Sequence, residues 1–121
     1  MLREITLGVV TLLATGFVPV TSYAQTREEV IEIIRDAATR HGVDDEWLVR
    51  VVSCETGGTF NPGAVGDRGA SIGLAQLHVR GLRPLFYQQG YSDPLNAWEA
   101  ADFMARSFAA GLARHWTCAR R

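Results

Sequence analysis

The 121-residue sequence contains no lysine and no run of basic side chains. Its basic residues, all arginine, number 12 against 13 acidic residues, so the formal net charge is -1 at pH 7. Nucleic-acid binding needs a basic patch, and a general electrostatic grip on an anionic surface needs an excess of positive charge. The composition therefore argues against a nucleic-acid partner. Any attachment to a polymer must therefore come from a specific groove in the domain, since no repeat or accessory binding module is visible in the sequence.

Long hydrophobic runs are also scarce, and the only candidate lies at the start of the chain. Arg3 precedes an apolar run from Ile5 to Val18, Pro19 follows it, and Ser22-Tyr23-Ala24 supplies small residues at the positions a signal peptidase reads. This layout predicts a secretory signal peptide over residues 1–24 and an exported domain over residues 25–121, periplasmic or extracellular. The alternative is an uncleaved anchor, but the run is shorter than the roughly 20 residues of a spanning helix. After cleavage we expect no stable membrane insertion.

Cysteine is the next scarce residue, with only Cys54 and Cys118 present. A chain of this length buries a modest core, and export favours a disulfide between the two, worth about 4 kcal/mol in the chain-entropy model. The alternative makes Cys54 a nucleophile with His41, His78 or His115 as its base. No motif supports that pairing.

Hydrophobic periodicity and capping residues predict helices over much of residues 25–121. Thr26 and Glu29 form a capping box, which predicts a helix over residues 27–41 that stops at Gly42. Asp44 is the next expected N-cap, and the helix after it carries Cys54 and Glu55 at its end.

The second half of the domain is expected to be less regular. Residues 56–71 are rich in glycine, asparagine, aspartate and proline, which predicts a loop or short irregular hairpin. Short helices are expected over residues 72–79 and 82–89, and Asn96 with Glu99 is expected to cap a last long helix. Its predicted apolar face comprises Ala101, Met104, Ala105, Phe108 and Leu112. The fold class is therefore a small, mostly α, single domain.

Three short segments follow one another in the order Glu55-Thr56, Asn61-Pro62 and Gly73-Leu74-Ala75-Gln76. In this order they resemble the signature of soluble lytic transglycosylases: a Glu followed by Ser or Thr, an Asn-Pro pair, and a later Gly-Leu-x-Gln. The Cys-Glu-x-Gly-Gly form around Glu55, with the later Trp116-Thr117-Cys118, is also similar to resuscitation-promoting factors. Both resemblances imply a lysozyme-like helical domain, with the loop or hairpin beside the active site.

The resemblance implies a role for several residues. Glu55 matches the catalytic acid, Thr56 follows it in the signature, and Gln76 matches a glutamine that borders the substrate groove. Ser71 stands where related sequences place a hydroxyl near the N-acetyl group of the sugar.

The Ala-Tyr-Asn-x-Gly motif common near the end of soluble transglycosylases is absent. Tyr87, Tyr91 and Trp98 are the candidates to replace its aromatic groups beside the substrate. The competing interpretation of each is ordinary core packing.

The activity implied is cleavage of the MurNAc–GlcNAc bond of peptidoglycan by one Glu, without a metal or other cofactor. Such an acid needs an elevated pKa, for which Val51, Phe60 and Leu74 are the expected sources of desolvation. One alternative is a hydrolytic lysozyme that uses Asp67 or Asp93 as a second carboxylate. Another is a peptidoglycan-binding module without catalysis.

The partners implied are peptidoglycan glycan strands. Three settings stay open: remodelling of the cell's own wall, assembly of an envelope-spanning secretion apparatus, and attack on competitors.

Overall fold

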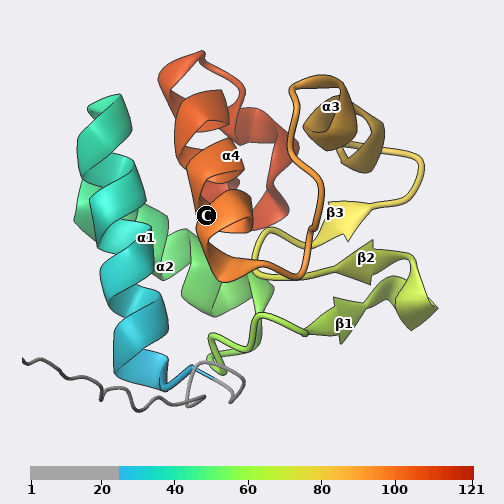
Figure 1. The fold of residues 1–121 in the computed structure, drawn as a ribbon, viewed down its shortest axis with the longest axis horizontal. Coiled ribbons are helices and arrows are strands. Elements are labelled where there is room, and N and C mark those ends of the chain that lie inside the picture. Colours follow the sequence, from blue (N-terminus) through green and yellow to red (C-terminus); the bar gives the residue numbers. More distant parts are fainter. Residues whose placement is uncertain (1–24) are drawn as a thin grey trace, which may run out of the picture.

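The computed structural model describes residues 25–121, so the predicted signal peptide lies outside the described residues. The described part is a small, mostly helical domain with a three-stranded antiparallel sheet at one side, which confirms the predicted fold class (Figure 1). Within it, no helix is both long enough and apolar enough to cross a membrane. The α-helices are α1 (Arg27–His41), α2 (Asp45–Glu55), α3 (Arg83–Gln88) and α4 (Ala97–Ala109).

The first two helices begin and end as their capping residues predict. The Thr26 hydroxyl accepts from the Glu29 amide, and the Glu29 carboxylate accepts from the Thr26 amide, so both halves of the capping box are present. Gly42 ends α1 with a left-handed backbone (φ 70°). Asp44 caps α2 by accepting from the Glu46 amide, and α2 ends at Glu55.

The last long helix, α4, forms the centre of the core. Asn96 caps it as predicted, by accepting from the Glu99 amide. The expected apolar face is buried except for Leu112, which lies beyond the helix end and is only partly buried. Residues outside that face are buried as well, among them Phe103, because α1 packs on α4 and an aromatic cluster surrounds Phe103. That cluster includes Phe86, Tyr91 and Trp116.

The segment expected to be a helix over residues 72–79 is instead part of the sheet. Strands β1 (Val65–Gly66), β2 (Ser71–Ile72) and β3 (Leu77–His78) pair in the order β1-β2-β3. The helix prediction was wrong because Gly73 and Gln76 both have left-handed backbone (φ 81° and 47°), which turns the chain back on itself. The hairpin expected within residues 56–71 is present as β1 and the start of β2.

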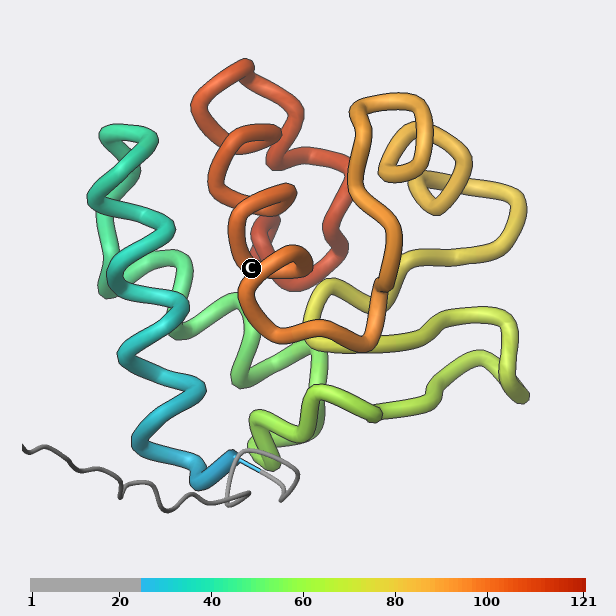
Figure 2. The backbone as a smooth tube through the Cα atoms, in the orientation of Figure 1, coloured from blue at the N-terminus to red at the C-terminus, as the bar shows by residue number. Residues whose placement is uncertain are grey.

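After α4 the chain turns back and its end returns to the middle of the molecule (Figures 1 and 2). Two short 3-10 helices follow, η4 (Ala113–His115) and η5 (Thr117–Arg120). Trp116 is buried between them and its indole N–H donates to the Ala75 carbonyl (2.8 Å). The predicted disulfide between Cys54 and Cys118 is present, and it ties η5 to the end of α2.

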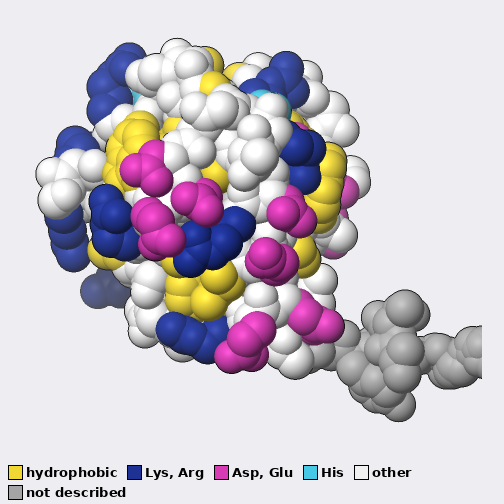
Figure 3. All heavy atoms as spheres, turned by 90° about the vertical axis from the view of Figure 1, so that its left-hand side faces the viewer, with side chains coloured by type: hydrophobic (Ala, Val, Ile, Leu, Met, Phe, Trp, Pro, Cys, Tyr) yellow, Lys and Arg dark blue, Asp and Glu magenta, His cyan; other side chains and the backbone are white. Residues whose placement is uncertain are grey.

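The face of the molecule formed by α1 and α2 carries interleaved acidic and basic side chains (Figure 3). Arg35 of α1 pairs there with Asp45 (3.0 Å) and Glu46 (2.9 Å) of α2. Because charges of both signs are interleaved, this face has no electrostatic potential of predominantly one sign, in keeping with the near-neutral composition.

Candidate active site

A cavity of about 710 Å³ lies where the end of α2, the sheet and the chain after α4 meet. It is large enough for a small-molecule or sugar ligand. Residues far apart in the sequence come together around it. They are Glu55, Gly66, Asp67, Ser71, Gln76, His78, Gly81, Leu82, His115, Trp116, Thr117, Cys118 and Arg121.

Glu55 is the acid of this cavity, at the last position of α2 and half-buried. Burial raises the pKa of its carboxyl group above the ordinary value, and the negative charge of Asp67 raises it further. The Cys118 amide, which donates to Glu55 Oε2 (3.3 Å), and the charge of Arg121 act in the opposite direction without cancelling the effect. Glu55 therefore keeps its proton to a higher pH than an exposed glutamate.

The residues expected to desolvate Glu55 lie in the core behind the cavity. Val51, Phe60 and Leu74 are all buried in the core, but none of them lines the cavity. The apolar lining comes from Leu82 and Trp116 instead. Leu82 precedes α3 and Trp116 follows α4, so this lining comes from two segments far apart in the sequence.

A second carboxylate, Asp67, lines the same cavity. The buried Ser71 hydroxyl donates to Asp67 Oδ2 (2.5 Å), so the two predicted groups form a pair on one wall. Asp67 has left-handed backbone (φ 50°), a conformation that costs a non-glycine residue of order 1–3 kcal/mol and is concentrated at functional sites. Asp93 does not line the cavity; it accepts from the Leu95 amide in the turn before α4.

Gln76 lines the cavity, as the resemblance implies, and its side chain is held by the backbone. Its amide nitrogen donates to the carbonyls of Gly73 (2.9 Å) and Ala64 (3.2 Å). Its Oε1 would lie 2.3 Å from a β-carbon at Gly66, so the lack of a side chain there makes room for it. Gly66 is thus needed for the position of Gln76.

Three of the predicted substrate-binding residues lie outside the cavity. Thr56 is buried, and its hydroxyl group both donates to the Val52 carbonyl and accepts from the Phe60 amide. Tyr91 packs on the core and its hydroxyl donates to Asp102 (2.7 Å). Tyr87 is 48% exposed on α3.

Trp98, the third aromatic candidate, also lies outside the cavity. Its ring is exposed on α4 and the Arg40 guanidinium stacks over it (4.6 Å). No aromatic side chain among the three candidates therefore faces Glu55.

Sequence reasoning placed none of five further lining residues beside Glu55, although it weighed two of them, His78 and His115, as bases for a Cys54 nucleophile. The five are His78, His115, Trp116, Thr117 and Arg121. Four of these follow α4, and the expected Cys54–Cys118 disulfide was the signal that could have found them. A bond from residue 118 to the neighbour of Glu55 brings the whole segment to the acid. His78 comes from β3, where a helix had been expected.

The donor set of the cavity favours acid–base chemistry. Across residues 25–121, no three His, Cys, Asp or Glu side chains gather closely enough to hold a metal ion. Comparisons with known proteins found no matching family model, no matching curated protein and no matching solved structure.

Proposed function

We propose that the protein is a lytic transglycosylase that cleaves the MurNAc–GlcNAc bond of peptidoglycan. The observation that carries the proposal is the position of Glu55, which is half-buried in a cavity of about 710 Å³ and has its pKa raised by burial. A general acid for glycosidic cleavage must be protonated near the working pH, and burial is one way proteins achieve this. The order of the Glu-Thr, Asn-Pro and Gly-Leu-x-Gln segments supports the same assignment.

In the first step, the Glu55 carboxyl group donates its proton to the glycosidic oxygen. The bond between that oxygen and the anomeric carbon of MurNAc breaks, and the GlcNAc part leaves with a free hydroxyl. The carbonyl oxygen of the MurNAc N-acetyl group supports the positive charge that develops at the anomeric carbon. Glu55 is left as a carboxylate.

In the second step, the 6-hydroxyl of the same MurNAc attacks its anomeric carbon. The hydroxyl proton passes to the Glu55 carboxylate, which restores the acid, and a 1,6-anhydro ring closes. No water is consumed, so one carboxyl group serves as acid and then as base. Ser71 and Gln76 are available on the cavity wall to bind the sugar.

The test is digestion of purified peptidoglycan by the parent protein and by Glu55→Gln, with the products weighed by mass spectrometry. We expect 1,6-anhydro muropeptides from the parent and none from the variant. Loss of a general acid costs about 100- to 10,000-fold in rate, so residual product should be near background. Undiminished turnover by Glu55→Gln would contradict the assignment. Binding to peptidoglycan without turnover by the parent would favour a non-catalytic module.

A hydrolytic lysozyme is the second candidate, and the position of Asp67 favours it. Asp67 lines the same cavity as Glu55, and a hydrolase needs a second carboxylate to activate water or trap the sugar. The Ser71 hydroxyl already occupies one oxygen of Asp67, which counts against that role. Hydrolysis would yield products heavier by one water, and Asp67→Asn would abolish them. A transglycosylase should instead retain the anhydro product in Asp67→Asn.

A further inference from the structure

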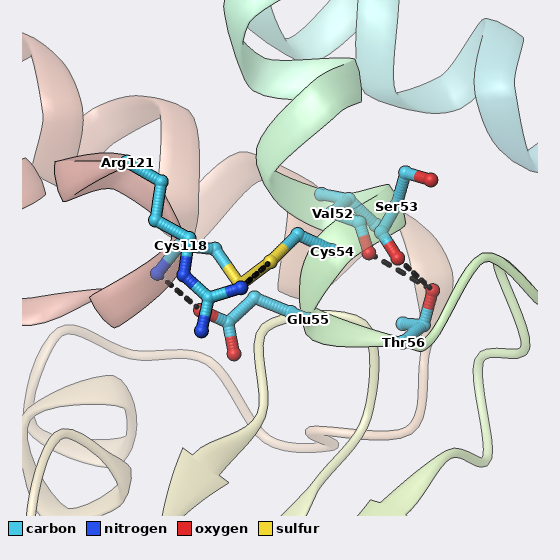
Figure 4. The surroundings of a disulfide bond; sticks show 7 residues. All are labelled: Val52, Ser53, Cys54, Glu55, Thr56, Cys118 and Arg121. Carbon is cyan, nitrogen blue, oxygen red and sulfur yellow. Dashed lines mark hydrogen bonds between the residues drawn. A yellow bond between two sulfur atoms is a disulfide. The ribbon is translucent and has the colours of Figure 1, made fainter.

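The disulfide is joined to the acid through two short links. Cys54 is the residue before Glu55 in the sequence, and its partner Cys118 donates its own backbone N–H to Glu55 Oε2 (3.3 Å). The other carboxyl oxygen points away from Cys118 (Figure 4). A protonated carboxyl group has one hydroxyl oxygen and one carbonyl oxygen, and an N–H donor selects the carbonyl oxygen. The contact therefore directs the proton to Oε1.

Few polar contacts hold this part of the chain on α2, although Cys118 and Ala119 also pack against the core. Trp116 is anchored independently, through its buried ring and its bond to the Ala75 carbonyl. Beyond it, the polar contacts to α2 are the Cys118–Glu55 bond and a contact from Arg121 to the Cys54 sulfur (3.6 Å). Cys118 itself is only partly buried. The disulfide is thus the strongest tether of residues 117–121.

We propose that the Cys54–Cys118 disulfide is a positioning element for Glu55, which holds the Cys118 amide on Oε2 and so selects Oε1 as the proton donor. The inference rests on the proposed function for its effect on turnover, but the contact itself can be tested separately. Opening the bond frees residues 117–121 while Trp116 keeps the core closed. Activity then falls although the domain stays folded.

Reduction is a balanced exchange. A dithiol reductant gives two electrons and two protons to the cystine, which yields the thiols of Cys54 and Cys118. The reductant closes to its own cyclic disulfide. No metal or further oxidant takes part.

The first test needs no activity. In the oxidised protein, the amide proton of Cys118 should shift in nuclear magnetic resonance spectra as pH is raised through the pKa of Glu55. Glu55→Gln should remove that transition. If the chemical shift of the Cys118 amide proton does not change as Glu55 ionises, the proposal is overturned, whatever reaction the protein catalyses.

The second test uses the double variant Cys54→Ser, Cys118→Ser, compared with the parent before and after treatment with dithiothreitol. We expect kcat to fall about 10- to 100-fold in the variant and in the reduced parent, the effect of misplacing a reacting group, with KM nearly unchanged. Dithiothreitol should not affect the double variant, which makes it the matched control. The Trp116 indole N–H signal should persist in both, showing that the core is intact.

The two tests separate two failures. If the parent releases no product, the proposed function fails, and the titration of the Cys118 amide still decides whether the contact exists. If the parent is active and the double variant keeps its kcat, the positioning proposal fails alone. A double variant too unstable to fold leaves the titration of the oxidised parent as the deciding measurement.

Discussion

Glu55 occupies a position where two features of its surroundings oppose a negative charge. It ends α2, which has no basic residue in its last turn, and the dipole of a helix disfavours an anion there. Burial disfavours the ionised form as well and raises the pKa of the carboxyl group. The residue that gives the cavity its acid is thus placed at a cost to stability.

That cost predicts a gain in stability for Glu55→Gln. Because the pKa of Glu55 is higher in the folded than in the unfolded state, its stabilising contribution is complete below the unfolded pKa and is lost as pH rises through the folded value. Glutamine carries no charge and keeps an oxygen for the Cys118 amide. Urea unfolding should show Glu55→Gln to be more stable than the parent at pH 8, with the difference shrinking toward pH 4. A constant difference across this range would contradict the raised pKa.

Gly73 is a second residue whose identity the fold requires. It has left-handed backbone (φ 81°), and a β-carbon there would lie 2.2 Å from the Pro94 carbonyl oxygen. The neighbour is backbone and cannot rotate away, so the chain before α4 or the turn after β2 would have to move.

We expect Gly73→Ala to lower the free energy of unfolding by at least about 2 kcal/mol, since backbone strain and overpacking each cost about 1–3 kcal/mol. Gly90→Ala is the matched control, because Gly90 also has positive φ (97°) but open space around its α-carbon. It should cost about 1 kcal/mol from the backbone alone. Thermal or urea unfolding of the two variants measures the difference. Equal losses of unfolding free energy would show that the backbone at Pro94 moves away from the new β-carbon at little cost.

At the scale of elements, Asp102 joins three parts of the chain. From α4 it accepts from Arg40 (2.9 Å) and His41 (2.9 Å) at the end of α1, and from the Tyr91 hydroxyl (2.7 Å) in the loop after α3. Burial by itself would raise the pKa of Asp102, but these donors outweigh it and lower the pKa below the ordinary value. The carboxylate therefore holds α1 against α4 as an ion.

Removing this carboxylate should destabilise the domain. Asp102→Ala leaves three donors without their shared acceptor, and we expect a loss of about 2–3 kcal/mol in urea unfolding. Since the folded pKa is lowered, the contribution of Asp102 is present above its unfolded pKa and is lost as pH falls through the folded value. The deficit of the variant should therefore shrink in strong acid. Glu46→Gln, which breaks an exposed pair with Arg35, should cost less than about 1 kcal/mol.

At the scale of the whole molecule, what could be predicted from sequence was local. Capping residues and apolar periodicity identify α1, α2 and α4, because those signals lie within a few residues of the elements they define. The sheet was partly missed, since its strands are two residues long and show no alternation. Turns at Gly73 and Gln76 replaced the expected helix.

For the site too, residues marked by a local sequence motif could be predicted, and residues brought in by tertiary folding could not. Glu55 and Gln76 were predicted from an ordered motif and Ser71 from its position in related sequences, and all three line the cavity. Thr56 and Tyr91 lie outside the cavity, and their hydroxyl groups bond to partners within the fold that periodicity does not reveal. The wall formed after α4 was missed because it comes from tertiary folding.

The distance along the chain between the acid and that wall sets an order of events during synthesis. Cys118 follows Glu55 by 63 residues, so at ribosomal speeds its peptide bond forms roughly 3 to 13 seconds later. Until then Glu55 stands at the end of a helix with water where the far wall will be, and its pKa stays close to that of a free glutamate. An unfinished or prematurely released chain would thus carry its acid in an unprimed form.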